Sequence, residues 1–198
     1  RLHNMRTLGV MRPEKRRRIA QETLDIYTPL AQRLGMHQIR IEMEDLCFQA
    51  MHPMRANMLS KAVLKARGNR KEVVSNVVES INTRLESEEL KGRVMGREKH
   101  LYSIYSKMKD HRKPFGDIMD VYGVRIIVEN VDCCYRTLGL VHSLFKPFPG
   151  RFKDYIAIPK ANGYQSLHTT LFGLHGIPIE VQIRTQQMED MANNGIAA

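Results

Sequence analysis

The sequence lacks any apolar run approaching the roughly 20 residues that a membrane-spanning helix requires. Its first ten residues, RLHNMRTLGV, also lack the apolar stretch of a signal peptide. These two absences predict a chain that neither crosses nor enters a membrane. We therefore expect a cytoplasmic location.

Cysteine is scarce, and the three that occur do not form the spacing of a metal site. Cys133 and Cys134 are adjacent, Cys47 is alone, and no CxxC pair suggests zinc. We expect all three to be reduced and structural. Internal repeats and low-complexity segments are absent as well, and 198 residues suffice for one large domain or two small ones.

Positive charge is plentiful and unevenly distributed. The formal net charge of +10 indicates anionic partners such as nucleotides, nucleic acid or acidic lipid. Residues 1–95 hold 18 Lys and Arg against 11 Asp and Glu, whereas residues 96–198 hold 13 against 10. The run from Lys15 to Arg18 favours a solvated helix face over a binding patch. An RNA- or ribosome-binding module, the reading that rests on this charge, stays open as an alternative.

The periodicity of apolar residues divides the chain near Leu90. Before it, three- and four-residue spacing predicts helices from Pro13 to about 34 and over 39–50, 52–66 and 70–89, with breaks at Gly35 and Gly68. After it, short β-branched segments predict five strands and two helices. The strands are expected at 92–96, 121–129, 155–159, 167–173 and 177–185, and the helices at 100–110 and 131–146. We predict an α/β (α+β) fold: a mixed five-stranded sheet flanked by helices and preceded by a helical region.

The segment IPIEVQIRT places three polar side chains on one face of a strand, because Glu180, Gln182 and Arg184 alternate with apolar residues. A solvent-exposed face explains this equally well. Asp120 is a possible partner carboxylate. It lies five residues before Arg125, so it either precedes its strand or Gly123 marks a bulge. Two carboxylates near strand ends are a usual means of holding Mg²⁺ on a triphosphate.

The segment GREKHLYSIYSKMK, residues 96–109, adds cations with a defined spacing. A helix that begins near Lys99 would place Lys99, Ser103 and Lys107 along one face, where they suit phosphate groups. Arg97 could lie flat on a purine ring. A solvated lysine face is the alternative.

The segment RFKDYIAIPKANGYQSLHTT, residues 151–170, reads as a hairpin that concentrates cations, an aromatic ring and a histidine. An aromatic ring offers a platform for a base, and flanking cations neutralise phosphate. The residues that suggest this are Arg151, Lys153, Asp154, Lys160, Tyr164 and His168.

In their order and spacing, GREKHLYSIYSKM, DIMDVYGVRIIV, GRFKDYIAIPKANGYQSLHTT and IPIEVQIRT resemble the (p)ppGpp synthetase domain of the RelA/SpoT homologue family, in particular its proteobacterial SpoT branch. The first residues, RLHNMRTL, resemble the stretch that follows the metal-binding aspartate of that family's HD hydrolase. The resemblance implies a hydrolase remnant at 1–12, a helical linker at 13–90 and a synthetase domain at 91–198. Asn4 and Thr7 resemble substrate contacts of the hydrolase, and we expect the chain to lack hydrolase activity.

The resemblance also implies a reaction. Pyrophosphate would pass from ATP to the 3′-hydroxyl of GTP or GDP, giving (p)ppGpp and AMP in the stringent response. The fold would be nucleotidyltransferase-like, although the GS-x-D-x-D signature is absent. The implied cofactor is Mg²⁺, with Mn²⁺ for the hydrolase of the full-length protein, whose regulatory domains would be further partners.

The same resemblance implies roles for individual residues. Asp120 and Glu180 would be the catalytic, metal-binding carboxylates, with Glu180 also acting as base on the 3′-hydroxyl. RFKD matches the RxKD form of bifunctional members, so Arg151, Lys153 and Asp154 would tune acceptor choice or metal use. The ATP-binding set would be Arg97, Lys99, Ser103, Lys107 and Arg125, and the acceptor set would be Lys160, Tyr164, His168 and Gln182.

A catalytically silent, regulatory synthetase-like domain is the second interpretation. AMP release from ATP plus GTP separates an active synthetase from this alternative and from the RNA-binding one. We expect no direct binding of nucleic acid by this chain.

Overall fold

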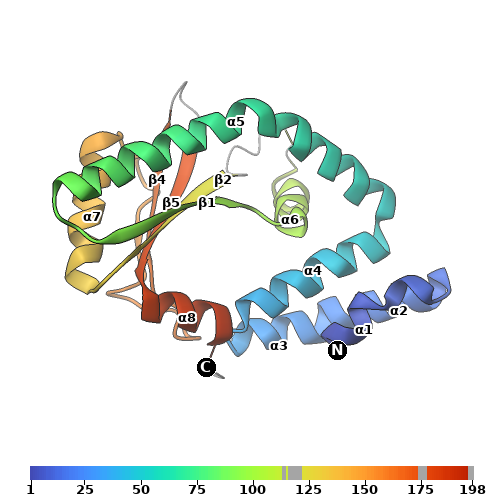
Figure 1. The fold of residues 1–198 in the computed structure, drawn as a ribbon. Coiled ribbons are helices and arrows are strands. Elements are labelled where there is room, and N and C mark those ends of the chain that lie inside the picture. The colour runs from blue at the N-terminus through green and yellow to red at the C-terminus, as the bar shows by residue number, and fades with distance from the viewer. Residues whose placement is uncertain (113–114, 116–121, 174–177, 196–198) are drawn as a thin grey trace.

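The computed structural model describes residues 1–112, 115, 122–173 and 178–195, with the side chains of 66–71, 98, 111 and 122 left aside. Helices dominate the first half, and the sheet is built from the second half (Figure 1). The elements are α1 Leu2–Arg6, the 3₁₀ turn η1 Leu8–Val10, α2 Pro13–Glu22, the π-helical turn η2 Thr23–Tyr27, α3 Thr28–Arg33, α4 His37–Met51, α5 Pro53–Ser87, β1 Gly92–Glu98, α6 Leu101–His111, β2 Tyr122–Val128, α7 Val131–Leu144, β3 Lys153–Asp154, β4 Leu167–Phe172, β5 Pro178–Thr185 and α8 Gln186–Asn194.

The sheet has five strands in the order β1-β2-β5-β4-β3. β2 and β5 run parallel, and the three other neighbouring pairs are antiparallel. The mixed five-stranded sheet predicted from the sequence is therefore confirmed. Because β2 and β5 are central and parallel, the side chains of one face of both strands project beside each other.

One face of the sheet is apolar and buried. It presents alternate residues of the three central strands, for example Val124, Val181 and Leu167, each at most 1 % exposed. Val77 and Ile81 of α5 and residues of α7 pack against this face in one continuous core. Figure 1 shows α5 arching over the sheet, with α7 beside it. Burial of this face is the main stabilising contribution to the second half.

Two predicted features are wrong. Gly68 does not break a helix, since α5 runs without interruption from residue 53 to 87. One glycine costs a helix about 1 kcal/mol, which the packing of α5 on the sheet outweighs. The predicted strand at 155–159 is instead a turn, because Asp154 Oδ1 accepts hydrogen bonds from the backbone N–H groups of Ile156 and Ala157 at 2.9 and 2.8 Å. This side-chain turn stops the strand after Asp154.

The helical region follows the predicted boundaries more closely. A helix begins at Pro13, and its path to Arg33 contains the π-helical turn that precedes Pro29, a residue without an N–H to donate. Gly35 ends this stretch with φ +72°. Residues of α1 and η1 pack on α2 and α4 in a second cluster around Met5, Leu8, Ala20 and Cys47. No helix in the described part of the chain combines the length and apolar character that crossing a membrane requires.

Candidate active site on the polar face of the sheet

The second face of the sheet gathers five of the predicted site residues into two rows. In the first row, Arg125 of β2 pairs with Gln182 of β5, which pairs with His168 of β4. In the second row, Arg97 of β1 pairs with Gly123, which pairs with Glu180. The face is therefore a continuous polar surface and not a solvent-exposed strand face, since Gln182 is only 8 % exposed.

Gly123 does not mark a bulge, because β2 keeps an unbroken register with both neighbours. A Cβ added at Gly123 would lie 2.9 Å from the backbone oxygen of Glu180. The glycine therefore permits close approach of β2 to β5 beside the Glu180 side chain. Asp120, the other predicted metal ligand, precedes β2 and lies outside the described residues.

Glu180 lies at the centre of a charged contact network. Its Oε2 is 2.9 Å from Lys99 Nζ, and its Oε1 is 3.5 Å from His168 Nδ1. Burial alone would raise the pKa of Glu180, but His168 and Lys99 outweigh burial and hold this pKa well below its ordinary value. Glu180 is thus an ionised oxygen donor at neutral pH.

A loop between β3 and β4 brings an aromatic ring to the same place. Gly163 adopts φ +76°, and Asn162 Oδ1 accepts a hydrogen bond from Tyr164 N–H at 3.3 Å, which together turn the chain. Tyr164 Oη lies 2.7 Å from His168 Nε2. Burial raises the pKa of Tyr164 and lowers the pKa of His168. The hydroxyl therefore donates to a neutral imidazole, whose Nδ1–H faces Glu180.

Cations surround this ring. Lys160 Nζ lies 5.0 Å from the centre of the Tyr164 ring, and Arg184 Cζ lies 5.6 Å from it. Both distances suit cation–π attraction. Two cations thus lie near the aromatic platform, Lys160 from the predicted segment 151–170 and Arg184 from β5.

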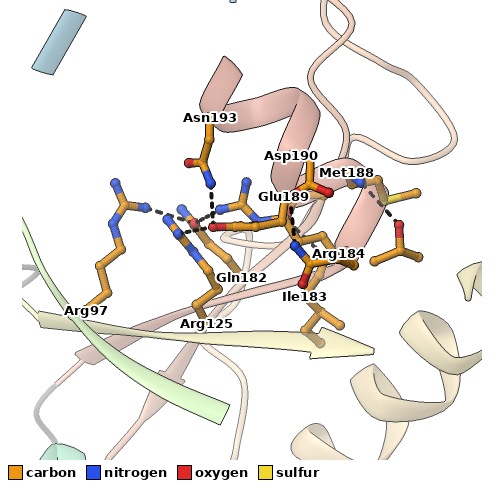
Figure 2. A network of polar contacts seen from close by, with 12 residues as sticks. Arg97, Arg125, Gln182, Ile183, Arg184, Met188, Glu189, Asp190 and Asn193 are labelled. Atoms are coloured by element: carbon orange, nitrogen blue, oxygen red, sulfur yellow. Dashed lines mark hydrogen bonds and ion pairs between the residues drawn. The ribbon is translucent and has the colours of Figure 1, made fainter. Parts of the chain in front are cut away.

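Three arginines of the polar face are held by one glutamate and one glutamine (Figure 2). Glu189 Oε1 of α8 accepts a hydrogen bond from Arg125 Nη1 at 2.7 Å, and Glu189 Oε2 lies 2.9 Å from Arg184 Nε. Gln182 Oε1 accepts from Arg97 Nη1 at 2.9 Å and from Arg184 Nη2 at 3.0 Å. Arg184 is only 2 % exposed. The network fixes the guanidinium groups and leaves an excess of positive charge on the face.

A pocket of about 200 Å³ opens over the platform. Its walls come from the loop, from the polar face, from α8 and, unexpectedly, from the corner between α3 and α4, where Gln32, His37 and Arg40 lie. The corner is anchored to the loop, since Asn162 Nδ2 donates to the backbone oxygen of Gln32 at 3.1 Å. Burial, with the nearby arginines, lowers the pKa of His37 to about 3. The pocket is thus partly buried and cationic, which suits an anionic ligand with an aromatic part.

Four of the predicted ATP-binding residues lie around β1 and α6, and the fifth, Arg125, lies on β2. Arg97 and Lys99 lie at the end of β1 and just after it. Ser103 and Lys107 lie one turn apart on α6, which begins at Leu101. Lys99 therefore precedes the helix and does not share its face as predicted, because β1 extends through residue 98. Lys99 instead reaches Glu180.

The remaining predicted residues lie away from the pocket. Arg151 and Lys153 are exposed, and Asp154 is engaged by its own turn and by the Tyr135 hydroxyl at 2.9 Å. Asn4 and Thr7 are exposed on and just after α1. The structure therefore gives Asp154 a clear role in shaping the loop.

Sequence reasoning assigned no site role to several residues that the structure places in or beside the pocket. Arg184 alternates with Glu180 and Gln182, so the strand pattern pointed to it. Glu189 follows on α8 as one of several polar residues without a distinctive spacing. The α3–α4 corner carries no local signal, because only the fold brings it within reach of residues more than 100 positions away. Among the described residues, no three His, Cys, Asp or Glu side chains gather closely enough to hold a metal ion between them.

Curated proteins similar to this chain include one named "Bifunctional (p)ppGpp synthase/hydrolase SpoT" from Escherichia coli, 59 % identical over 198 residues. Another, named "GTP pyrophosphokinase", comes from Myxococcus xanthus and is 50 % identical over 198 residues. Both matches cover the whole chain, which spans 28 % and 26 % of these relatives.

Among solved structures, the chain resembles the small alarmone synthetase 1 from Bacillus subtilis bound to its product pppGpp, with a TM-score of 0.54 and 26 % identity. The likeness covers 67 % of this chain and 78 % of that one. The predicted nucleotidyltransferase-like fold class is thereby confirmed.

Two family models match the sequence. One describes an HD domain and covers residues 1–37. The other describes the region found in RelA / SpoT proteins and covers residues 96–198, more than half of the chain. The chain therefore belongs to the RelA/SpoT family.

Proposed function

We propose that this chain transfers pyrophosphate from ATP to the 3′-hydroxyl of GTP or GDP, forming (p)ppGpp and releasing AMP. The observation that carries the proposal is that one polar face holds both an aromatic, cationic pocket and an ionised carboxylate, Glu180. The relatives named as a (p)ppGpp synthase and a GTP pyrophosphokinase, and the likeness to a synthetase bound to pppGpp, support it.

The pocket around Tyr164 is the proposed acceptor site. The guanine ring would stack on Tyr164, with Lys160 and His168 at its phosphates. Base stacking on an aromatic ring is worth about 1 to 3 kcal/mol. The hydrogen bond from the Tyr164 hydroxyl to His168 fixes the ring beside the carboxylate. The acceptor would thus lie within reach of Glu180.

Lys99, Arg97 and Arg125, together with Ser103 and Lys107 of α6, form the proposed donor site for ATP. The phosphates carry more negative charge than one carboxylate, so they compete with Glu180 for Lys99. Opening of this ion pair is the proposed first step. Glu180 then becomes available to accept the proton of the 3′-hydroxyl, a role for which its pKa in the paired state is too low.

Glu180 also has the chemistry of a Mg²⁺ ligand, because an ionised carboxylate is the oxygen donor that this cation prefers. We propose that Glu180 holds Mg²⁺ together with Asp120. The cation would neutralise charge that develops on the transferred phosphates. The remaining chemistry comes from residues of the chain: Lys99 binds phosphate, Tyr164 orients the acceptor and Glu180 receives the proton.

Incubation of the chain with Mg²⁺, ATP and GDP, scored for AMP, tests the proposal. Glu180→Gln removes the carboxylate and keeps its shape, so AMP formation should fall by about 10² to 10⁴, as when a general base is lost. Glu129→Gln, at an exposed position after β2, is the matched control. If Glu180→Gln keeps more than about a tenth of the parent rate, well short of that loss, the assignment of Glu180 as base is wrong. Nucleotide binding without turnover by the parent chain would favour the silent, regulatory domain.

A further inference from the structure

α6 begins without a capping side chain from its own segment. Its N-cap residue, His100, makes no side-chain hydrogen bond to the first turn. The first N–H groups of a helix have no partner within the helix and need one from elsewhere. Here the partner comes from α4, since Asp45 Oδ1 accepts a hydrogen bond from the backbone N–H of Tyr102 at 2.9 Å.

The other oxygen of Asp45 faces the same helix start. Asp45 Oδ2 lies 3.6 Å from His100 Nδ1, and the Asp45 side chain is 25 % exposed. A carboxylate at a helix N-terminus is also attracted by the partial positive charge of the unpaired N–H groups. Asp45 therefore does for α6 what a local Ser or Asp does for most helices.

Aromatic packing orients the rest of α6 on the same support. Phe48, one turn after Asp45, stacks on Tyr105 with ring centres 4.5 Å apart and meets Tyr102 edge-on at 6.2 Å. Arg55 of α5 donates to the Tyr105 hydroxyl at 3.1 Å. Figure 1 shows α6 between α4 and α5. The position of α6 is thus set from the helical region.

We propose that Asp45 is a positioning residue for the ATP half of the site. By fixing the start of α6, it fixes Lys99 just before the helix and Ser103 and Lys107 on it. This inference rests on the proposed function, which assigns these three residues to ATP phosphates. Asp45 lies outside both residues 1–37 and residues 96–198, the ranges that match the two family models. Its role is visible only in the folded contacts.

Two variants of Asp45 separate the hydrogen bond from the charge. Asp45→Ala removes both, whereas Asp45→Asn keeps a side-chain oxygen that can accept from Tyr102 N–H. Glu79→Ala, at an exposed position of α5 beside α7, is the matched control. The measurements are the Kd values of Mg-ATP and of GDP by calorimetry, and hydrogen exchange of the Tyr102 amide by NMR.

We expect Asp45→Ala to weaken Mg-ATP binding roughly threefold to tenfold, the range that follows from loss of a helix cap, and to leave GDP within about twofold. Exchange at Tyr102 should accelerate. Asp45→Asn should restore both properties to near the parent values, and Glu79→Ala should change neither.

An unchanged Kd for Mg-ATP in Asp45→Ala would overturn the proposal. Equal weakening of both nucleotides with a lower Tm would overturn it too, because that is the pattern of a purely structural residue. If the parent chain itself does not bind Mg-ATP, the proposed function fails and the positioning role fails with it. Exchange at Tyr102 in the Ala and Asn variants then still decides whether Asp45 caps α6.

Discussion

Removal of the charge on Glu189 should cost much of the stability of the fold. Glu189 is 7 % exposed, and its two oxygens lie 2.7 Å from Arg125 Nη1 and 2.9 Å from Arg184 Nε. Glu189→Gln keeps the shape of the side chain and leaves two guanidinium groups without their counter-charge. Arg184 cannot turn to water, because it is 2 % exposed.

Breaking a buried ion pair from one side costs about 3 to 5 kcal/mol. A domain is stable by about 5 to 15 kcal/mol in total, so Glu189→Gln should bring this chain close to unfolding at 37 °C. Asp190→Asn is the matched control, since Asp190 is the exposed neighbour, and it should change stability by less than about 0.5 kcal/mol.

Urea unfolding followed by far-UV circular dichroism measures both variants, and tyrosine fluorescence adds a second probe because the chain has no tryptophan. The expected result is a much lower midpoint for Glu189→Gln and an unchanged midpoint for Asp190→Asn. A loss below about 1 kcal/mol for Glu189→Gln, no more than a typical surface change, would show that solvent or neighbouring groups screen the three charges. The buried network of Glu189, Arg125 and Arg184 described above would then be wrong.

Two further predictions concern the pocket. Tyr164→Ala should weaken GDP binding roughly tenfold to a hundredfold and leave ATP binding nearly unchanged. Tyr164→Phe keeps the stacking ring and should bind GDP almost as the parent chain does. Equal losses of affinity for both nucleotides would mean that Tyr164 merely packs in the fold. The pKa of His37 is about 3 in the folded chain against an ordinary value of 6.5, so the unfolded chain binds more protons between these values and stability falls as pH falls from 6.5 to 3. His37→Gln should reduce the slope of unfolding free energy against pH by up to about 1.4 kcal/mol per pH unit across that window. His3→Gln, at an exposed position, should leave the slope unchanged. Equal slopes in the parent chain and in both variants would contradict the burial of His37.

The strand pattern of residues 177–185 was informative because one face had to be apolar, so Glu180, Gln182 and Arg184 had to share the other. Strand pairing then brought Arg97 and Arg125 to the same surface, which the strand patterns alone did not predict. The β-branched residues of 155–159 favour a strand, so the end of β3 at Asp154 was not predictable from them. It ends there because the Asp154 side chain diverts the backbone into a turn.

The α3–α4 corner was beyond sequence reasoning for a different reason. Its residues Gln32, His37 and Arg40 look like ordinary helix-end positions, and their place beside Tyr164 depends on contacts across more than 100 residues. Asp45 is a similar case, since its partner on α6 is 57 residues away. Local patterns predict elements and the faces they present, but not which distant helix end completes a pocket.

Transfer of a labelled pyrophosphate group tests the central claim most directly. The chain is incubated with Mg²⁺, GDP and ATP that carries a radioactive β-phosphorus, and the products are separated. The account predicts that the label appears in a guanosine product bearing a 3′-diphosphate, and that unlabelled AMP forms in equal amount. Label that remains in ATP, or that appears only in ADP or free phosphate, would contradict the account.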